Sequence, residues 1–445
     1  MTSVNDEKKK PRKIILGPRY RIVIIGANFA GIKAASALSK DFKVTVIDPR
    51  PYFEYYPNIH ELISGIKKPD NLRLPRKSII HGFGHRFIQD HVEKIDGGKN
   101  KVYTSSGKKF YFDFCIVAVG GVNNTFGIKG ADQFALPFKS VQDCYLIGQK
   151  LKKLSKSGNG LKIVIVGGGL EGIEALGEIL RKYRTFPGLK IELIEKSHQL
   201  LPGMISSLDN EIRHLCEPYH VSFRTGLGVE KVTNDKIHLS SGEILCTDIT
   251  IWTCGAVAPE LLNQSGLSNN PGQWAPAGLS LQSRFFEQIF VVGDAADLPD
   301  PLSKQAYYAM DMGILAAENI LHVVNGLNPV NFKPCSRPSL ITFGDLSTFL
   351  ITDKVALAGP VLSTMKESLF QLTMVMLDKK TRLGGLFDTT FRAISGARAF
   401  VLPTLTSFAA LKRMGRLKLL PVTVQSPETV HIKTTARNKQ GPGGG

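Results

Sequence analysis

The chain carries the stretch RIVIIGANFAGIKAASAL at residues 21–38 and repeats its pattern as KIVIVGGGLEGIEALGEI at residues 162–179. In both stretches a run of β-branched residues, typical of a buried parallel strand, leads through a glycine-rich turn into a helical pattern. The turn positions are Gly26, Asn28 and Gly31 in the first stretch, and Gly167, Gly169 and Gly172 in the second. Each stretch therefore predicts a strand, a dinucleotide-binding turn and a helix.

An acidic residue ends the next apolar run after each turn. It is Asp48 in KVTVIDP and Glu195 in KIELIEK. A pyrophosphate binds at a helix N-terminus because free backbone N–H groups and the helix dipole favour negative charge there, and the acid accepts hydrogen bonds from a ribose. Two such sites on one chain predict two redox cofactors that face one another, which is the organisation of a flavoprotein.

Length and composition agree with a globular enzyme. The 445 residues are 43% hydrophobic and 21% charged, and they are enough for two or three domains. We find no apolar run of about 18 residues and no signal-peptide core, so we expect a cytoplasmic chain without a transmembrane helix, at most peripheral to a membrane. Six scattered cysteines, of which Cys246 and Cys254 are closest in sequence, form no motif for a redox dithiol or a metal site.

The net charge of +18 is concentrated towards both ends of the chain. Residues 1–19 predict a flexible basic arm. Residues 379–420 interleave Lys and Arg with Phe and Leu, and TLTSFAALKRMGRLKLL at 404–420 predicts a short basic amphipathic helix. Such a helix can lie in a membrane surface, so residues 400–420 are a candidate membrane contact. The alternatives are a packed helix with a solvated basic face and, less favoured, a nucleic-acid surface.

Other segments predict further elements. SKQAYYAMDMGILAAENILHVVNG at 303–326 has helical spacing and ends on an Asn-Gly stop signal. Beyond residue 332, strand-like pieces at 339–344 and 347–359 precede a helical pattern at 364–380. This last part predicts a separate α+β unit.

The motifs outside the two turns carry a resemblance to known flavoproteins. FDFCIVAVGG, WTCG and FVVGDAA resemble motifs of the two-dinucleotide-binding flavoproteins with a glutathione-reductase-like fold. NNTFGIKG, HQLLPG and VGDAADLPDPL resemble the type II NADH dehydrogenases and the similar AIF-like NADH:quinone oxidoreductases. The resemblance spans residues 21–325 and implies an α/β fold with two Rossmann-like dinucleotide-binding domains plus a C-terminal α+β cap.

The resemblance also implies FAD at the first turn and NADH at the second. The expected domains are a flexible arm at 1–19, a split FAD-binding domain at 20–158 and 246–330, an NADH-binding domain at 159–245, a cap at 331–420 and a flexible tail at 421–445.

The family's binding residues map onto matching positions of this chain. The residues expected to bind FAD are Gly26, Ala27, Asn28, Gly31, Asp48, Ala118, Gly120, Gly293 and Asp294. Those expected to bind NADH are Gly167, Gly168, Gly169, Gly172, Glu195 and Gly255. Glu174 matches an acid near the nicotinamide, the alternative being a surface helix residue. The charge of Glu195 should repel the 2′-phosphate of NADPH and so favour NADH, although Lys196 moderates that preference.

The chain departs from the family pattern at two places. Asn28 replaces the second glycine of the first turn, where we expect altered contact with FAD but retained binding, because Asn tolerates unusual backbone angles and can donate a hydrogen bond. At the acceptor side, Tyr307, Asp311 and Met312 replace the family's glutamines. Tyr307 and Tyr308 are there expected either to stack on a quinone or cover the flavin, or to pack in the core.

These observations predict an FAD-dependent NADH oxidoreductase that passes electrons to a quinone at a membrane surface. One alternative is a soluble reductase of a protein acceptor such as a ferredoxin, which would meet the basic surface. Another is an AIF-like flavoprotein that binds nucleic acid or a signalling partner. The sequence leaves the oligomeric state open, a homodimer included.

Overall fold

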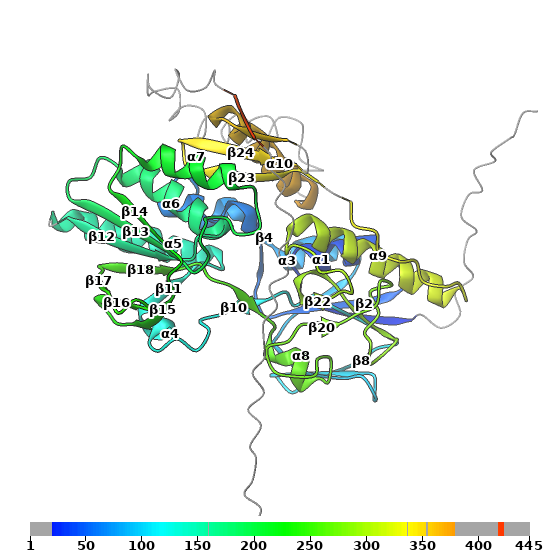
Figure 1. The fold of residues 1–445 in the computed structure, drawn as a ribbon. Coiled ribbons are helices and arrows are strands. Elements are labelled where there is room, and N and C mark those ends of the chain that lie inside the picture. The colour runs from blue at the N-terminus through cyan, green and yellow to red at the C-terminus, as the bar shows by residue number, and fades with distance from the viewer. Residues whose placement is uncertain (1–19, 159, 336, 353–354, 379–416, 422–445) are drawn as a thin grey trace, which may run out of the picture.

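The computed structural model describes residues 20–158, 160–335, 337–352, 355–378 and 417–421. Two α/β units lie side by side, and a smaller cap lies over both (Figure 1). The predicted arm at 1–19 falls outside the described residues, and so does the predicted tail beyond residue 421.

The first unit is built on a five-stranded parallel sheet of order β21-β9-β1-β2-β5. Its central strand is almost wholly buried because Ile and Val side chains fill both of its faces. The sheet strands are β1 (Arg21–Ile25), β2 (Lys43–Asp48), β5 (Arg86–Gln89), β9 (Phe114–Val117) and β21 (Ile289–Val291). The helices of this unit are α1 (Phe29–Ala37), α3 (Arg76–Gly82), α8 (Glu260–Gln264) and α9 (Ala306–Val324). The short helix α2 (Glu61–Ser64) packs instead against two helices of the second unit, α5 (Val141–Leu154) and α6 (Leu170–Tyr183).

Shorter strands surround this sheet. A three-stranded antiparallel sheet and a two-stranded pair belong to the first unit. They consist of β6 (Val92–Asp96), β7 (Lys101–Thr104) and β8 (Lys109–Tyr111), and of β3 (Tyr52–Glu54) and β4 (Arg73–Pro75). Two further short pairs are β20 (Ala275–Pro276) with β22 (Ala296–Asp297), and β10 (Val122–Asn123) with β19 (Ala256–Val257).

The second unit repeats the plan with a parallel sheet of order β11-β18-β12-β13-β14. Its strands are β11 (Ala135–Pro137), β12 (Leu161–Val166), β13 (Leu189–Glu195), β14 (Val221–Thr225) and β18 (Ile249–Trp252). Its helices are α4 (Ala131–Phe134), α5 (Val141–Leu154), α6 (Leu170–Tyr183) and α7 (Ser206–Cys216). A small antiparallel sheet completes it with β15 (Val229–Val232), β16 (Lys236–Leu239) and β17 (Ile244–Cys246).

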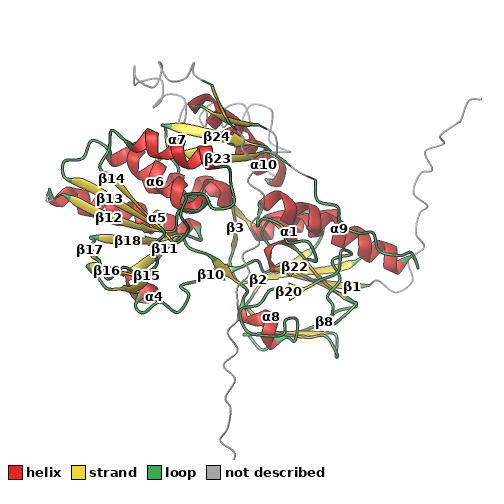
Figure 2. Ribbon diagram, in the orientation of Figure 1, coloured by secondary structure: helices red, strands yellow, loops and turns green. Residues whose placement is uncertain are grey.

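The cap is a four-stranded antiparallel sheet with one long helix (Figure 2). It consists of β23 (Ser339–Phe343), β24 (Ser347–Ile351), β25 (Ala356–Ala358), β26 (Lys418–Leu420) and α10 (Ser363–Leu377). The cap packs closely on the second unit. A Cβ built on Gly177 of α6 would lie only 2.4 Å from the backbone nitrogen of Gly344 in the cap. The fold class predicted from the sequence, two Rossmann-like units plus an α+β cap, is therefore confirmed.

The prediction of a helix over 404–420 is wrong at its end. Lys418–Leu420 is strand β26, which pairs with β25 through Ala358↔Lys418 and Ala356↔Leu420. Side chains alternate there, since Leu419 is 69% exposed and Leu420 is 3% exposed. The edge of β25 offers unpaired backbone groups, and pairing with them outweighs the local helical spacing. Residues 404–416 lie outside the described part of the chain.

Candidate dinucleotide sites

The first glycine turn joins β1 to α1, and packing alone requires two of its glycines. Gly26 has φ +94°, and a Cβ on it would lie 2.3 Å from the carbonyl oxygen of Ala118. A Cβ on Gly31 would lie 1.9 Å from the carbonyl oxygen of Gly26. Asn28 precedes α1 with an ordinary φ of −109°, and its side-chain oxygen accepts a hydrogen bond of 3.3 Å from Glu54 N. The amide is thus bonded to β3.

The second turn, between β12 and α6, has the same geometry. Gly167 has φ +110°, and a Cβ on Gly172 would lie 1.9 Å from the Gly167 carbonyl oxygen. Gly169 is different, because it has an ordinary φ of −75° and a Cβ there would meet nothing within 4 Å. The protein itself does not need a glycine at this position. The missing side chain leaves space in front of the first turn of α6, where a phosphate binds in turns of this kind.

The acid after each turn bonds to that turn. Asp48 accepts a hydrogen bond of 2.7 Å from Ala27 N, and Glu195 accepts one of 2.7 Å from Gly168 N. Glu195 also accepts from Ser197 N at 2.7 Å. Each carboxylate therefore fixes the middle of its glycine turn and lies beside it, at the place where a ribose hydroxyl would need an acceptor.

Arg76 is a residue that the sequence did not indicate. It is 2% exposed, at the start of α3, and its guanidinium spans the first turn. Its Nε donates to the Ala27 carbonyl at 2.6 Å, and its Nη1 donates to Asp48 Oδ1 at 2.6 Å and to the Arg50 carbonyl at 2.9 Å. Arg76 thereby connects the turn, the acid after β2 and the following loop.

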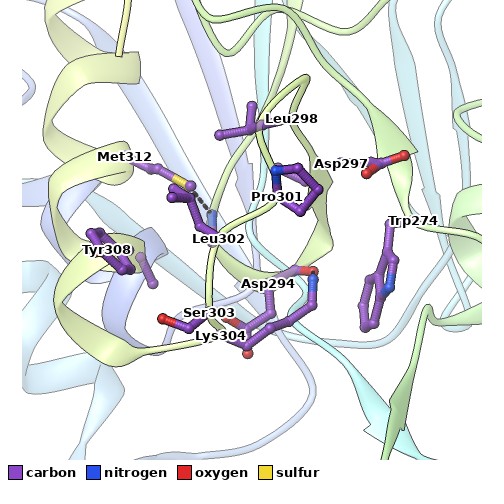
Figure 3. Close-up of a pocket in the computed structure, with 13 residues that line it drawn as sticks. Trp274, Asp294, Asp297, Leu298, Pro301, Leu302, Ser303, Lys304, Tyr308 and Met312 are labelled. Atoms are coloured by element: carbon purple, nitrogen blue, oxygen red, sulfur yellow. Dashed lines mark hydrogen bonds between the residues drawn. The ribbon is translucent and has the colours of Figure 1, made fainter. Parts of the chain in front are cut away.

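Asp294 lies in a short 3-10 turn that follows β21, and it lines a cavity between the first sheet and α9 (Figure 3). Burial raises the pKa of its carboxyl, and the charges of Lys304 and Lys139 oppose that rise. Lys304 Nζ donates to the Asp294 carbonyl and lies 3.6 Å from the centroid of the Trp274 ring. The lining residues are Trp274, Gly293, Asp294, Ala296, Asp297, Leu298, Pro301, Leu302, Ser303, Lys304, Tyr308, Ala309 and Met312.

Gly120 and Gly121 follow β9, and they differ in the space that a side chain would have there. A Cβ on Gly120 would meet nothing within 4 Å, and φ at this residue is +65°. The Trp274 ring lies against the neighbouring Gly121, with a built Cβ only 2.9 Å from it. Open space at Gly120 and a half-buried acid at Asp294 fit a polyhydroxylated chain attached to a flat ring, which are the parts of FAD that the sequence assigned here.

Glu174 is not a surface residue, which excludes the alternative considered from the sequence. It projects from α6 towards the cap, where Thr342 N donates to Oε1 at 3.3 Å and Lys366 Nζ pairs with the same oxygen. His60 Nδ1 lies 3.3 Å from Oε2. Burial alone would raise the pKa of Glu174, but the charges of His60 and Lys366 outweigh burial and lower that pKa to about 2.

The model of one protein family, described as "Pyridine nucleotide-disulphide oxidoreductase", matches residues 20–313. The chain belongs to this family. The match contains both glycine turns and Asp294, and it confirms the flavoprotein resemblance inferred from the motifs.

Relatives agree with this family assignment. The type II NADH:quinone oxidoreductase of Staphylococcus aureus strain MSSA476 is 25% identical over 384 residues, which are 78% of this chain and 94% of that protein. A solved structure of NDH2 from Plasmodium falciparum in complex with NADH has a TM-score of 0.74 at 16% identity and covers 85% of this chain and 98% of its own. The sulfide:quinone oxidoreductase of Aquifex aeolicus has a TM-score of 0.73 at 20% identity, covering 83% and 94%.

In this oxidoreductase Cys115, Cys144, Cys216, Cys246 and Cys254 are free thiols. Cys254 is half-buried and lies beside the second glycine turn, where its Sγ donates to the Val166 carbonyl at 3.2 Å. Burial raises the pKa of Cys254 to about 12, so it stays a thiol at neutral pH. The neighbouring Gly255 has φ +59°, and a built Cβ would lie 2.7 Å from the Phe126 ring.

The two acceptor-side tyrosines differ in position. Tyr308 lines the cavity beside Asp294, whereas Tyr307 stacks under the Arg337 guanidinium, which also pairs with Asp311 at 2.8 Å. The two tyrosine rings lie 4.3 Å apart between centroids. Of the two tyrosines, Tyr308 is therefore the one that lines the cavity.

A further pair that the sequence did not indicate lies at the second turn. Lys139, between β11 and α5, donates to both carboxylate oxygens of Glu171 at 2.7 and 2.6 Å. Glu171 is in the first turn of α6, two residues after Gly169. No local sequence pattern predicts this ion pair, because Lys139 and Glu171 are far apart in the sequence.

Proposed function

We propose that this protein is an FAD-dependent oxidoreductase that oxidises NADH and passes the electrons to a quinone at a membrane surface. The observation that carries the proposal is the pair of matched glycine turns, each fixed by its own acid, with open space in front of Gly169 and at Gly120. The names of the curated relatives support the quinone as acceptor.

In this proposal the first turn and the Asp294 cavity hold FAD. The backbone N–H groups at the start of α1 bind its pyrophosphate, Asp48 accepts from the adenosine ribose, and Asp294 accepts from the ribitol. The cofactor, once bound, supplies hydride acceptance from NADH and electron transfer to the acceptor. The residues of the chain supply position and charge, and no protein nucleophile is needed.

The second turn holds NADH. The N-terminus of α6 binds the pyrophosphate in the space left by Gly169. Glu195, held by Gly168 N and Ser197 N, presents its negative charge to the adenosine ribose and so disfavours a 2′-phosphate. We therefore expect NADH to be preferred to NADPH.

The outer face of the cap supports attachment to a membrane. Met365, Leu369, Leu372 and Met376 follow one another at helical spacing on α10, and their exposed fractions are 46%, 53%, 58% and 51%. Leu417, just before β26, and Leu419, within it, add two more exposed apolar side chains. The chain between α10 and β26 is rich in Lys and Arg. An apolar face that is followed in the chain by a basic segment matches a lipid surface with anionic headgroups. Among the described residues, no helix has the length and hydropathy needed to cross a membrane.

Anaerobic titration tests the redox half of the proposal. NADH should bleach the flavin at lower concentration than NADPH, and a quinone should restore the oxidised spectrum. Restoration by ferredoxin but not by any quinone would redirect the proposal to a soluble protein acceptor. A flavin that NADH leaves oxidised would refute the enzymatic function.

Flotation with anionic liposomes tests the membrane half. The variant Leu369→Glu/Leu372→Glu should lose binding. Leu146→Glu is the matched control, because Leu146 is a leucine on α5 of the second unit with a similar exposed fraction of 47%. Unchanged flotation of the α10 variant would contradict membrane binding by this face of α10. If the variant instead converts a dimer to a monomer, the face contacts a second copy of the chain.

A further inference from the structure

The Lys139–Glu171 pair lies at the place where the two dinucleotide sites meet. Lys139 follows β11 of the second sheet, and Glu171 lies in the first turn of α6. Their side chains are 25% and 36% exposed, so the pair borders solvent and is not part of the core. The Lys139 charge also lowers the pKa of Asp294 on the FAD side and of Cys254 on the NADH side, against the larger effect of burial. Lys139 therefore acts electrostatically on both sites.

Glu171 places a negative charge at the helix N-terminus where the proposed ligand is also negative. A carboxylate in the first turn of a helix is stabilised by the helix dipole, but it opposes any other anion that approaches the same N-terminus. The open space at Gly169 lies only two residues before Glu171 in the chain. Without Lys139, the second turn would present a negative charge where a pyrophosphate is to bind.

We propose that Lys139 supplies positive charge to the diphosphate of the nicotinamide dinucleotide and that Glu171 competes with the diphosphate for this charge. The inference rests on the proposed NADH site. In the free protein the ammonium group is held by Glu171. When the dinucleotide binds, the same ammonium neutralises the diphosphate, so the pair sets the affinity of the second turn for its ligand.

A purely structural ion pair would behave differently. A partly exposed pair contributes only about 0–1 kcal/mol to stability, and loss of either member would act in the same direction. The proposed competition gives opposite signs, because removal of Lys139 adds repulsion whereas removal of the Glu171 charge frees the lysine for the ligand.

The test is calorimetric binding of NAD⁺ and of ADP-ribose, which shares the diphosphate but lacks the nicotinamide, to the FAD-loaded protein. Lys139→Met should raise Kd for both ligands by about fivefold or more, as expected for loss of one charge–phosphate interaction of about 1 kcal/mol. Glu171→Gln should lower both Kd values, and Lys139→Met/Glu171→Gln should fall between the two. Lys139→Arg should retain the affinity of the unmodified protein.

Arg184→Met is the matched control. Arg184 lies directly after α6, at the end opposite Glu171, pairs with Asp345 at 2.6 Å and has a similarly exposed side chain at 23%. Its loss removes the same charge but should leave both Kd values unchanged. Flavin absorbance and the unfolding temperature verify that each variant is folded.

Two results would overturn the inference while leaving the proposed function intact. One is equal weakening of NAD⁺ binding by Lys139→Met and Glu171→Gln, which would make the pair structural. The other is no change in either variant. Failure of the unmodified protein to bind NAD⁺ would instead refute the proposed NADH site itself.

Discussion

Replacement of Arg76 by Met should destabilise the protein strongly and release FAD. Arg76 is 2% exposed and makes hydrogen bonds to the Ala27 carbonyl, the Arg50 carbonyl and Asp48. Without it, the Asp48 carboxylate, whose side chain is only 9% exposed, remains buried without its cation. Breaking a buried pair in this way costs about 3–5 kcal/mol, which lowers the folded-to-unfolded ratio by about a hundredfold or more.

Urea unfolding at pH 7, followed by far-UV circular dichroism, measures this loss, and flavin fluorescence reports the release of FAD. Arg21→Met is the control, because Arg21 pairs with Asp113 in the same unit but is 46% exposed, and it should cost no more than about 1 kcal/mol. The double variant Arg76→Met/Asp48→Asn should be more stable than Arg76→Met alone, since it carries no unpaired buried charge. Equal midpoints for Arg76→Met and Arg21→Met would refute the reasoning.

Further substitutions separate folding from binding. Gly172→Ala should lower both the unfolding temperature and NAD⁺ affinity, because its Cβ would lie 1.9 Å from a backbone oxygen, whereas Gly169→Ala should unfold normally and lose affinity only. Asn28→Gly should keep or tighten FAD, and flavin loss on that change would contradict the assignment of the first turn. The pKa of Glu174 is lowered from 4.5 to about 2, so its contribution to stability is present above pH 4.5 and is lost as the pH falls towards 2. Glu174→Gln should therefore flatten the acid dependence of urea unfolding below pH 4.5, and an unchanged slope would contradict this pKa.

The glycine turns could be predicted because their information is local. A strand, a turn and a helix follow one another within 18 residues in each of the quoted stretches, and the clash that requires Gly31 involves Gly26 of the same turn. Retained FAD binding with Asn28 stays a prediction, and the bond that Asn28 Oδ1 accepts from Glu54 N was not foreseen. That bond depends on the packing of β3 against the first glycine turn, which no local sequence pattern predicts.

The residues that were missed act across long sequence separations. Arg76 reaches Asp48 from 28 positions away, and Lys139 reaches Glu171 from 32 positions away. A lone Arg or Lys in a loop carries no pattern, so neither could be singled out. The environment of Glu174 depends on Lys366, which the cap brings to it from 192 positions away.

The wrong helix prediction at residues 418–420 also arose because a partner far away in the sequence decides the structure. The spacing of Leu and Lys around Leu417 satisfied a helical pattern, but the partner that decides the conformation is β25. Local spacing describes only what a segment does in isolation, and a free strand edge elsewhere in the chain changes the outcome.

Because β26 pairs with β25, the cap sheet can gain its fourth strand only late in synthesis of the chain. The ribosome makes β23, β24, β25 and α10 well before residues 418–420, so the nascent cap presents an open strand edge until the last part of the chain emerges. A chain truncated after residue 416 would keep that edge open permanently. Such a truncation is therefore expected to yield aggregated protein, and point substitutions on α10 are the safer test of the proposed membrane attachment.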